Sequence, residues 1–552
     1  MRFSVTSWFK FLFLISLSIC LLLGQVSLTK AQPPEPSQLV QQGVAEYQNQ
    51  EYQAAIALWQ QALASYQATA DNPNTVIVLE NLARAYQQIG QTEQAIAFWS
   101  QVTEKYQQAG NQKQLGRSLT EQAQAYSKLG QHRQAIALLC ASSGEWRREA
   151  SAKAYRYAYP LGHSPNKQDL HNKSITINSE AKNECPTGSA IAIAQEQQDQ
   201  LGSAAALGSL GEAYRLRGNY QNAASYAQKS LAAAQLQNNP QLTMSALNSL
   251  ANTYSSLAQV SYRRAESAQR RGQTYGSNSL WAVETKNAQQ SDRQALNYFH
   301  QGRLVTAASD SLAQVRSLIS SLPIYYRLQQ YEDAATVKQK ALSLMPTLPP
   351  EQTTVYATID LAKLLQPGKA TFSSCLNADN LRQAQALLKP AATLATKLGD
   401  QRAESFALGE LGHIYECQEN YQQALKFTQQ ARLAAEKDKD SLYLWEWQTG
   451  RVLSSQGNKA ESINAYETAI ATLESIRDDL LTANRDLQFD FRDTVEPIYR
   501  ELIEQRLATE DQTIVIPANQ TAQVANISSV LNTVDSLRLA ELQNYFGNDC
   551  AI

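Results

Sequence analysis

Residues 210–223 read Leu-Gly-Glu-Ala-Tyr-Arg-Leu-Arg-Gly-Asn-Tyr-Gln-Asn-Ala, and this stretch decides the fold. A large apolar residue, a small residue and then Tyr214 share one face of a helix. Gly218 marks a turn, and a second run that reaches Ala223 follows it. Small residues such as Gly211 allow two antiparallel helices to approach closely. The stretch therefore predicts a helical hairpin.

The hairpin pattern recurs with a shift of 40 residues. Tyr86-Gln-Gln-Ile-Gly90 matches Tyr126-Ser-Lys-Leu-Gly130. The same shift relates Ala55 to Ala95 and Ala135, Trp59 to Trp99, and Tyr214 to Tyr254. One hairpin cannot bury its apolar face alone, so neighbouring hairpins must stack. The sequence predicts an all-α fold, a right-handed α-solenoid of helix-turn-helix repeats.

The chain of 552 residues is globular in composition, with 43% hydrophobic residues, but too long for one compact core. We expect repeats near 36–71, 76–110, 116–140, 204–238, 244–300, 315–346, 354–400, 405–436 and 443–476. The fifth is predicted to carry a polar stretch, 263–297, between its helices. The predicted organisation is a signal peptide (1–31), repeats 1–3 (32–140), a loop insertion (141–188), repeats 4–9 (189–476) and a helical C-terminal connector (477–552).

The first 31 residues have the features of a signal peptide. Arg2 and Lys10 form a basic start, and 14 apolar residues follow from Phe11 to Gly24. Small residues precede a cleavage site after Ala31. A spanning helix needs about 20 apolar residues, so cleavage is favoured over an uncleaved anchor. We expect an exported protein, periplasmic or extracellular, without a stable membrane span after cleavage.

Charge and motifs argue against several classes of function. The formal net charge is −2 and no basic stripe follows the chain, so nucleic acid is not an expected partner. Neither a phosphate-binding glycine loop nor a nucleophile elbow occurs. None of the histidines has metal-binding spacing; they are His132, His163, His171, His300 and His413. We expect no enzymatic activity, no metal and no cofactor.

Five cysteines remain after cleavage, and export would allow disulfides. Cys140 and Cys185 bracket the insertion, and Cys375 and Cys417 join a second loop to a helix. Closing such a loop by a disulfide stabilises by roughly 4 kcal/mol. Four cysteines allow three pairings, and buried free thiols are the alternative. Cys550 is left over, either free or paired with another chain.

The motifs quoted above resemble the tetratricopeptide repeat, whose pattern is Leu-Gly-x-x-Tyr followed by Gly-x-Tyr-x-x-Ala. That repeat usually has about 34 residues, and the longer period here resembles the long repeats of bacterial signalling proteins. In this family, first-helix residues outside the Leu-Gly-Tyr face line a concave groove. The partner-binding candidates carried over are Arg84, Gln124, Lys128, Glu212, Arg215, Asn248, Asn252, His413, Trp447 and Arg451.

The resemblance implies an interaction scaffold, and the mixed charges of these candidates suit an extended peptide or a protein surface. Trp447 lies on a different face from Trp445, which is expected in the core, and it is a candidate for exposure.

The C-terminal segment resembles a connector in cyanobacterial proteins that join such repeats to a CHAT domain, a caspase-like fold. The matching stretches are Phe489–Arg500 and Leu537–Phe546. The sequence ends at Ile552, near where that domain would begin, so none of its catalytic residues can be carried over. Three hypotheses follow: an exported scaffold for a peptide or protein, a regulatory subunit that acts in trans with a CHAT-type peptidase, and a truncated remnant of such a protein.

Overall fold

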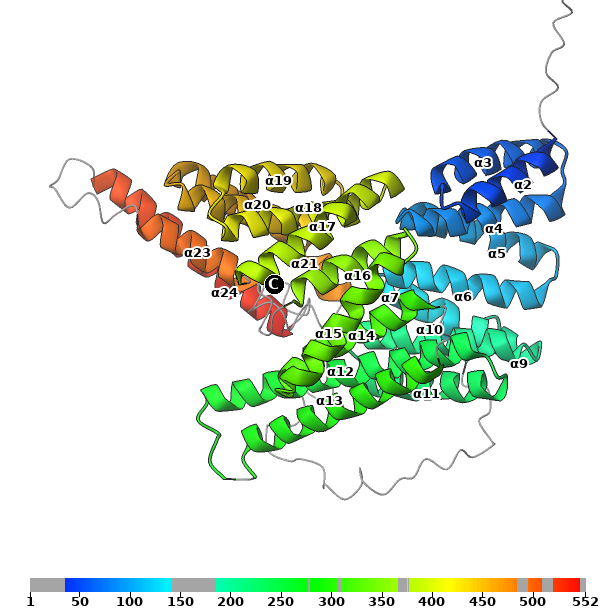
Figure 1. Ribbon diagram of the computed structural model, residues 1–552, viewed down its shortest axis with the longest axis horizontal. Coiled ribbons are helices and arrows are strands. Elements are labelled where there is room, and N and C mark those ends of the chain that lie inside the picture. Colours follow the sequence, from blue (N-terminus) through cyan, green and yellow to red (C-terminus); the bar gives the residue numbers. More distant parts are fainter. Residues whose placement is uncertain are drawn as a thin grey trace, which may run out of the picture.

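The computed structural model is an all-α solenoid (Figure 1). It describes residues 35–140, 185–276, 278–305, 310–365, 375, 377–483, 495–508 and 520–546. The expected signal peptide, residues 141–184 of the insertion, and Cys550 lie outside these ranges. Within them, every regular element is a helix. No helix of this described part combines the length and apolar character that a membrane crossing requires.

A helix of 17 residues and a turn of three set the period of the regular repeats. These helices include α3 (Tyr52–Ala68), α4 (Asn72–Gln88), α5 (Thr92–Gln108), α6 (Gln112–Lys128), α10 (Gln200–Leu216) and α11 (Tyr220–Leu236). Two helices and two turns therefore give the 40-residue period that the sequence shows.

The last two residues of each three-residue turn have separate roles. The first adopts a positive φ, as at Gly110 (67°), which glycine does at little cost. The second caps the next helix: Asn111 Oδ1 accepts a hydrogen bond from the backbone N–H of Gln114 at 3.3 Å. The same type of cap occurs at Asp71, Asp199, Asn219, Asn239, Asp310, Asp400 and Asn420. These turns fix where the helices begin and end.

The other helices complete the array. In chain order they are α2 (Pro36–Gln48), α7 (His132–Cys140), α9 (Ala190–Glu196), α12 (Pro240–Arg270), α13 (Leu280–Val305), α14 (Ser311–Arg327), α15 (Tyr331–Leu344), the 3-10 turn η1 (Met345–Thr347), α16 (Gln352–Lys363), α17 (Ala378–Leu398), α18 (Gln401–Cys417), α19 (Tyr421–Ala434), α20 (Lys439–Ser455), α21 (Lys459–Ala483), α23 (Glu496–Leu507) and α24 (Gln520–Phe546).

Glycine and tyrosine determine how the two helices of a hairpin pack. A Cβ on Gly211 would lie 3.1 Å from backbone atoms of both Ala223 and Ala227, so α10 and α11 approach too closely for a larger residue. One turn further along α10, Tyr214 stacks on Tyr226 with ring centroids 5.5 Å apart. Equivalent stacks join Tyr86 to Phe98 and Tyr415 to Phe427.

The insertion divides the second helix of the third repeat. α7 has nine residues and α9 has seven, and both pack against α6. In a regular repeat, α10 would begin about 20 residues after the start of α7 at His132. It begins at Gln200 instead, so the insertion adds 48 residues. A disulfide between Cys140 and Cys185, with Cα atoms 4.8 Å apart, joins the two sides of this break.

The prediction that a polar stretch, 263–297, lies between the helices of the fifth repeat is wrong. α12 continues to Arg270 and α13 begins at Leu280, so most of 263–297 is helical. Small residues recur every seven positions on both helices and are buried: Ala251, Ala258 and Ala265 on α12, and Ala288, Ala295 and Gly302 on α13. A seven-residue spacing keeps one side of each helix against the other. The polar residues between them occupy the remaining faces.

The solenoid returns to its own beginning. Lys397, at the end of α17, forms an ion pair with Glu51, in the turn after α2, at 2.9 Å. Gln53 lies beside Gly399, and one hydrophobic cluster contains side chains from both α2–α4 and α16–α18. In Figure 1 the chain runs from blue helices through cyan and green ones and back to yellow. Helices α2–α4 thus pack against α16–α18, which lie much later in the chain.

Candidate functional site

The candidates of the early repeats connect neighbouring helices. Arg84 pairs with Glu80 at 2.9 Å, and its guanidinium lies 5.4 Å from the centre of the Trp99 ring. Gln124 donates a hydrogen bond to Ser209 Oγ at 3.0 Å and so links α6 to α10. Part of the hydrogen-bonding capacity of these candidates is therefore used within the scaffold.

The candidates of α10 form an internal ion pair. Arg215 donates two hydrogen bonds to Glu212, at 2.9 and 2.7 Å. Burial alone would raise the pKa of Glu212, but Arg215 outweighs it and lowers this pKa. Two further candidates, Asn248 and Asn252, are half-buried on α12.

The charge of Arg316 acts on three charged residues of other repeats, and we call these four residues the inner quartet. They are Lys128 of α6, Glu212 of α10, Arg316 of α14 and Asp360 of α16. Lys128 keeps an exposed surface, but the surrounding helices desolvate its ammonium, and this effect and the charge of Arg316 together lower its pKa. Burial raises the pKa of Asp360, against the opposing effects of Lys363 and Arg316. Arg316 therefore lies close enough to Lys128, Glu212 and Asp360 for its charge to influence each of them.

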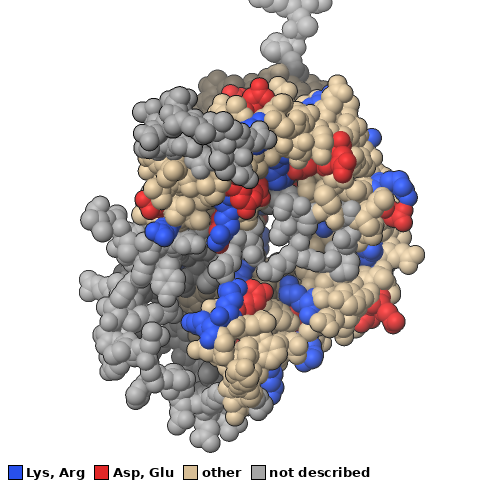
Figure 2. All heavy atoms as spheres, turned by 90° about the vertical axis from the view of Figure 1, so that its left-hand side faces the viewer, with Lys and Arg blue, Asp and Glu red and all other residues tan. Residues whose placement is uncertain are grey.

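The two cations of the inner quartet are not used in ion pairs within the described part of the chain. Lys128 and Arg316 are exposed, and neither forms an ion pair or hydrogen bond with another described residue. Figure 2 shows basic and acidic side chains interspersed across the middle of the face that it presents. Sequence reasoning missed Arg316 and Asp360 because the sequences of α14 and α16 depart from the repeat motif.

The expectation that Trp447 is exposed is wrong. Its side chain is 1% exposed, and its Nε1 donates a hydrogen bond to Glu501 Oε2 of α23 at 2.6 Å. Arg451 stacks on the Trp447 ring at 4.7 Å and donates to both oxygens of Glu416, at 2.8 and 2.9 Å. The reason is that α23 covers this part of the solenoid, which counting repeats alone cannot show.

Further contacts of α23 show that it is part of the core. Tyr466 of α21 also donates to Glu501 Oε2, at 2.9 Å, and Tyr499 forms a hydrogen bond with Glu474. Ile498, Tyr499 and Leu502 are buried against the last repeats. The described part of the connector thus caps the end of the array.

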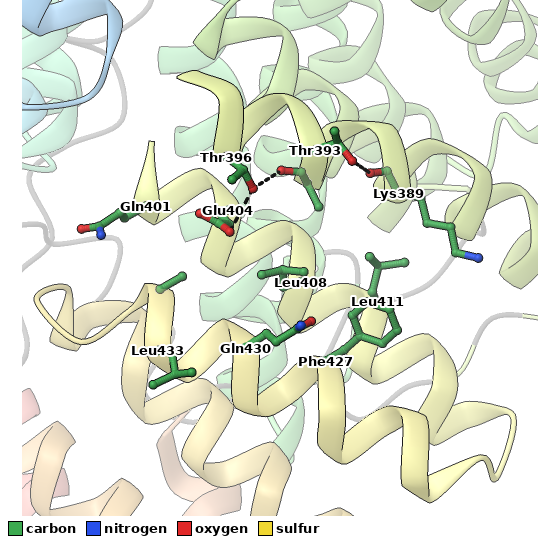
Figure 3. A pocket seen from close by; sticks show the side chains of 12 residues that line it. Lys389, Thr393, Thr396, Gln401, Glu404, Leu408, Leu411, Phe427, Gln430 and Leu433 are labelled. Carbon is green, nitrogen blue, oxygen red and sulfur yellow. Dashed lines mark hydrogen bonds between the residues drawn. The ribbon is translucent and has the colours of Figure 1, made fainter. Parts of the chain in front are cut away.

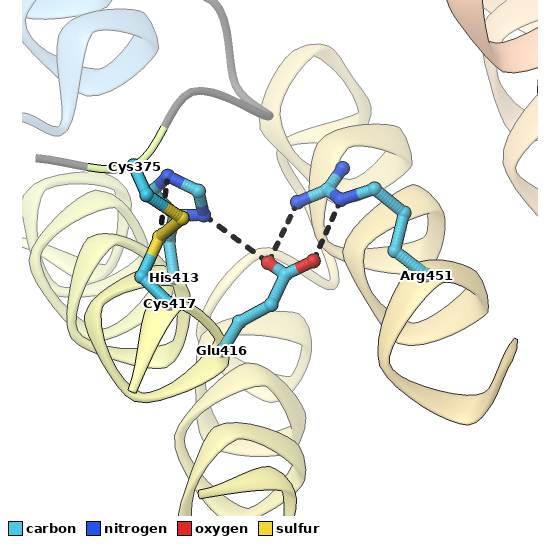
Figure 4. The surroundings of a disulfide bond; sticks show 5 residues. All are labelled: Cys375, His413, Glu416, Cys417 and Arg451. Atoms are coloured by element: carbon cyan, nitrogen blue, oxygen red, sulfur yellow. Dashed lines mark hydrogen bonds and ion pairs between the residues drawn. A yellow bond between two sulfur atoms is a disulfide. The ribbon is translucent and has the colours of Figure 1, made fainter. Parts of the chain in front are cut away.

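The candidate His413 belongs to the same polar group. Its Nδ1 lies 3.1 Å from Glu416 Oε2, and its Nε2 lies 3.6 Å from Cys417 Sγ (Figure 4). Cys417 forms a disulfide with Cys375, with Cα atoms 5.5 Å apart. The structure therefore places His413 beside this disulfide. His132, which was expected to be solvated or packed, is buried, and burial lowers its pKa to about 4.

A second concave feature lies between α17, α18 and α19 (Figure 3). It is an open cavity of about 650 Å³. Leu408, Leu411 and Phe427 form its apolar part, while Lys389 and Glu404 lie at its polar part. Thr396 donates a hydrogen bond to Glu404 at 2.9 Å, so this carboxylate already has a partner. Sequence reasoning did not identify this cavity.

Three stretches of the chain match models of the tetratricopeptide repeat: residues 38–108, 206–241 and 407–442. They correspond to the first two repeats, the fourth and the eighth. A search of curated protein sequences finds no match. The tetratricopeptide character is therefore shown for these stretches.

Solved structures align over large parts of the solenoid. Yeast Tom70 aligns over 93% of this chain and 97% of its own, with 13% identity and a TM-score of 0.26. The apo form of RapI aligns over 63% and 97%, with 10% identity and a TM-score of 0.33. A Rap protein in complex with competence and sporulation factor aligns over 64% and 99%, with 13% identity and a TM-score of 0.31. Alignments at these scores contribute nothing to the choice of partner.

Proposed function

We propose that the chain is an exported scaffold without catalytic activity that binds an extended peptide or protein segment on its inner face. The observation that carries this proposal is the inner quartet, in which Arg316 interacts electrostatically with charged residues on helices of three other repeats. Lys128 and Arg316 are exposed there without partners in the described part of the chain. Tetratricopeptide-type arrays present such surfaces on rigid helices, which suits binding rather than chemistry.

The charges indicate the class of ligand. A carboxylate, from an acidic side chain or a peptide C-terminus, would form charge-assisted hydrogen bonds with Lys128 and Arg316. The charge of Arg316 lowers the pKa of Lys128, which shows that the two cations repel each other. A bound carboxylate would offset this repulsion, and we therefore expect it to bind favourably. The carboxylates of Glu212 and Asp360 disfavour a strongly acidic ligand, so we propose a segment of mixed charge with an anchoring acid.

The test is selection from a library of random peptides followed by affinity measurement at low and high salt. The double variant Lys128→Glu/Arg316→Glu should weaken binding at least 10-fold at low salt, with a smaller effect at high salt. The matched control is Arg382→Glu, a cation on α17 that is also exposed but lies outside the inner quartet. Equal binding by wild type and both variants would refute the inner-face site.

Export rests on the basic start, the apolar run and the small residues before position 32. Mass spectrometry of the protein recovered from cell-envelope and culture fractions should find a mature N-terminus at Gln32. Recovery of the intact Met1 form from the cytoplasm alone would contradict export.

A second proposed function is regulation in trans of a CHAT-type caspase-like protein, as the connector resemblance implies. The observation that favours it is the apolar side of α24, where Ile527, Leu531 and Leu539 are each about half exposed. Exposed apolar side chains in a row are typical of protein contacts. The variant Ile527→Asp/Leu531→Asp should abolish co-purification with such a protein and leave peptide binding at the inner face unchanged.

A further inference from the structure

The two disulfides have different surroundings. His413 Nε2 lies 3.6 Å from Cys417 Sγ, and the ligand atoms of Cys375, His413 and Cys417 all lie within 4.8 Å of one another (Figure 4). Within the described residues, this is the only such group of three or more His, Cys, Asp or Glu ligand atoms. The Cys140–Cys185 disulfide, in contrast, is buried and belongs to no such group among them.

The distance between His413 and Cys417 matches that between two ligands of a tetrahedral zinc site. Zinc lies about 2.3 Å from thiolate sulfur and about 2.0–2.1 Å from imidazole nitrogen, which places ligand S and N about 3.6 Å apart and two sulfurs about 3.8 Å apart. The distance between His413 Nε2 and Cys417 Sγ already has the first value. The bonded sulfurs Cys375 Sγ and Cys417 Sγ would have to separate, and all three ligand atoms already lie within 4.8 Å of one another.

The histidine is oriented as a metal ligand would be. Its Nδ1 faces Glu416 Oε2 at 3.1 Å, and Arg451 fixes that carboxylate through two hydrogen bonds. A carboxylate that accepts the Nδ1–H of a histidine leaves the Nε2 lone pair for a metal, and this is the usual arrangement around zinc ligands. Here Nε2 lies 3.6 Å from Cys417 Sγ.

The disulfide is also accessible to a reductant. Cys375 is exposed and precedes α17, outside any described helix, whereas Cys417 is half-buried at the end of α18. A dithiol can therefore attack the exposed sulfur: the S–S bond breaks, the dithiol is oxidised to a disulfide, and each cysteine sulfur takes a proton. Zn²⁺ would then bind both sulfurs as thiolates and release those two protons to solvent.

We propose that reduction by a dithiol converts the Cys375–Cys417 disulfide into a zinc site with Cys375, His413 and Cys417 as ligands and a water in the fourth position. The disulfide and the zinc site exclude each other, because both use the sulfur atoms of Cys375 and Cys417. Metal binding at the end of α18 is independent of peptide binding by the inner quartet.

The test uses the full chain without a histidine tag, reduced with a phosphine and titrated with Co²⁺ as a spectroscopic substitute for Zn²⁺. Reduced protein should bind one equivalent with a thiolate-to-cobalt charge-transfer band, and Zn²⁺ should abolish the band by displacement. Oxidised protein should show no band. The matched control, Cys140→Ser/Cys185→Ser, should retain the band, and Cys375→Ser/Cys417→Ser should lose it.

Ligand variants then identify the histidine. We expect His413→Ala to weaken cobalt binding by about 100-fold, His413→Cys to restore it with a stronger charge-transfer band, and Glu416→Gln to weaken it by about 10- to 100-fold. Circular dichroism checks that each variant is helical. If His413→Ala loses helicity, cobalt binding by His413→Cys shows whether position 413 supplies a ligand. The proposal fails if reduced, helical wild-type protein binds no Co²⁺, or if the band persists in Cys375→Ser/Cys417→Ser.

Discussion

Two parts of the inner face carry residues at the same motif position but differ in what covers them. Glu212 follows Leu210-Gly211 in α10, and His413 follows Leu411-Gly412 in α18. Glu212 belongs to the inner quartet, beside the unpartnered Lys128 and Arg316. His413 instead lies in a polar group with Glu416 and Arg451 next to the helix α23. A motif position therefore indicates the direction of a side chain, but only the rest of the chain determines whether a ligand can reach it.

The largest expected effect is a loss of stability where α23 covers the last repeats. Trp447→Ala would remove a fully buried side chain, its hydrogen bond to Glu501 and the surface on which Arg451 stacks. We expect the free energy of unfolding to fall by about 3–5 kcal/mol. Denaturant unfolding followed by circular dichroism measures this change. A loss below about 1 kcal/mol would mean that α23 does not stabilise the last repeats.

A pH titration tests the same region with a smaller effect. Burial would raise the pKa of Glu416, but Arg451 and His413 outweigh it and lower this pKa from 4.5 to about 2. A lowered folded pKa means that the stabilisation is complete above about pH 4.5 and is lost as the pH falls toward 2. The difference in unfolding free energy between wild type and Glu416→Gln should shrink by about 1.4 kcal/mol per pH unit across this window. A difference independent of pH would contradict the ion pair.

The smallest effect on stability is expected at the inner quartet. Arg316→Ala removes an exposed side chain that has no partner among the described residues, so the unfolding free energy should change by less than about 0.5 kcal/mol. The same variant should weaken binding of a library-selected peptide. A stability loss comparable to that of Trp447→Ala would show that Arg316 supports the fold rather than a ligand.

The fold was predictable from the sequence because the local signals agree with one another. The Leu-Gly-x-x-Tyr motif, its close approach at Gly211 and the 40-residue shift all specify stacked hairpins. In the fifth repeat, polar composition suggests a stretch between helices, whereas small residues such as Ala258 and Ala265 recur every seven positions. That spacing was visible in the sequence and indicates two closely packed helices.

The candidate site was less predictable, because it depends on contacts between distant parts of the chain. The motif placed Lys128 and Glu212 on the inner face, but Arg316 and Asp360 join them only because the array curves back on itself. Conversely, Trp447 has the sequence position of a groove residue and is buried because α23, beyond the repeats, packs on it. Repeat periodicity predicts neither the curvature that brings Arg316 and Asp360 near Lys128 and Glu212 nor the packing of α23 on Trp447.

The most direct test of the inner-face account is site-specific photocrosslinking with a selected peptide. A photoreactive side chain is introduced in place of Arg316, or in place of Leu236, which is 80% exposed outside the inner quartet. Mass spectrometry then compares the crosslinked fractions. The account predicts crosslinks from position 316 and none above background from position 236. Equal crosslinking from both positions, or crosslinking from 236 alone, would contradict it.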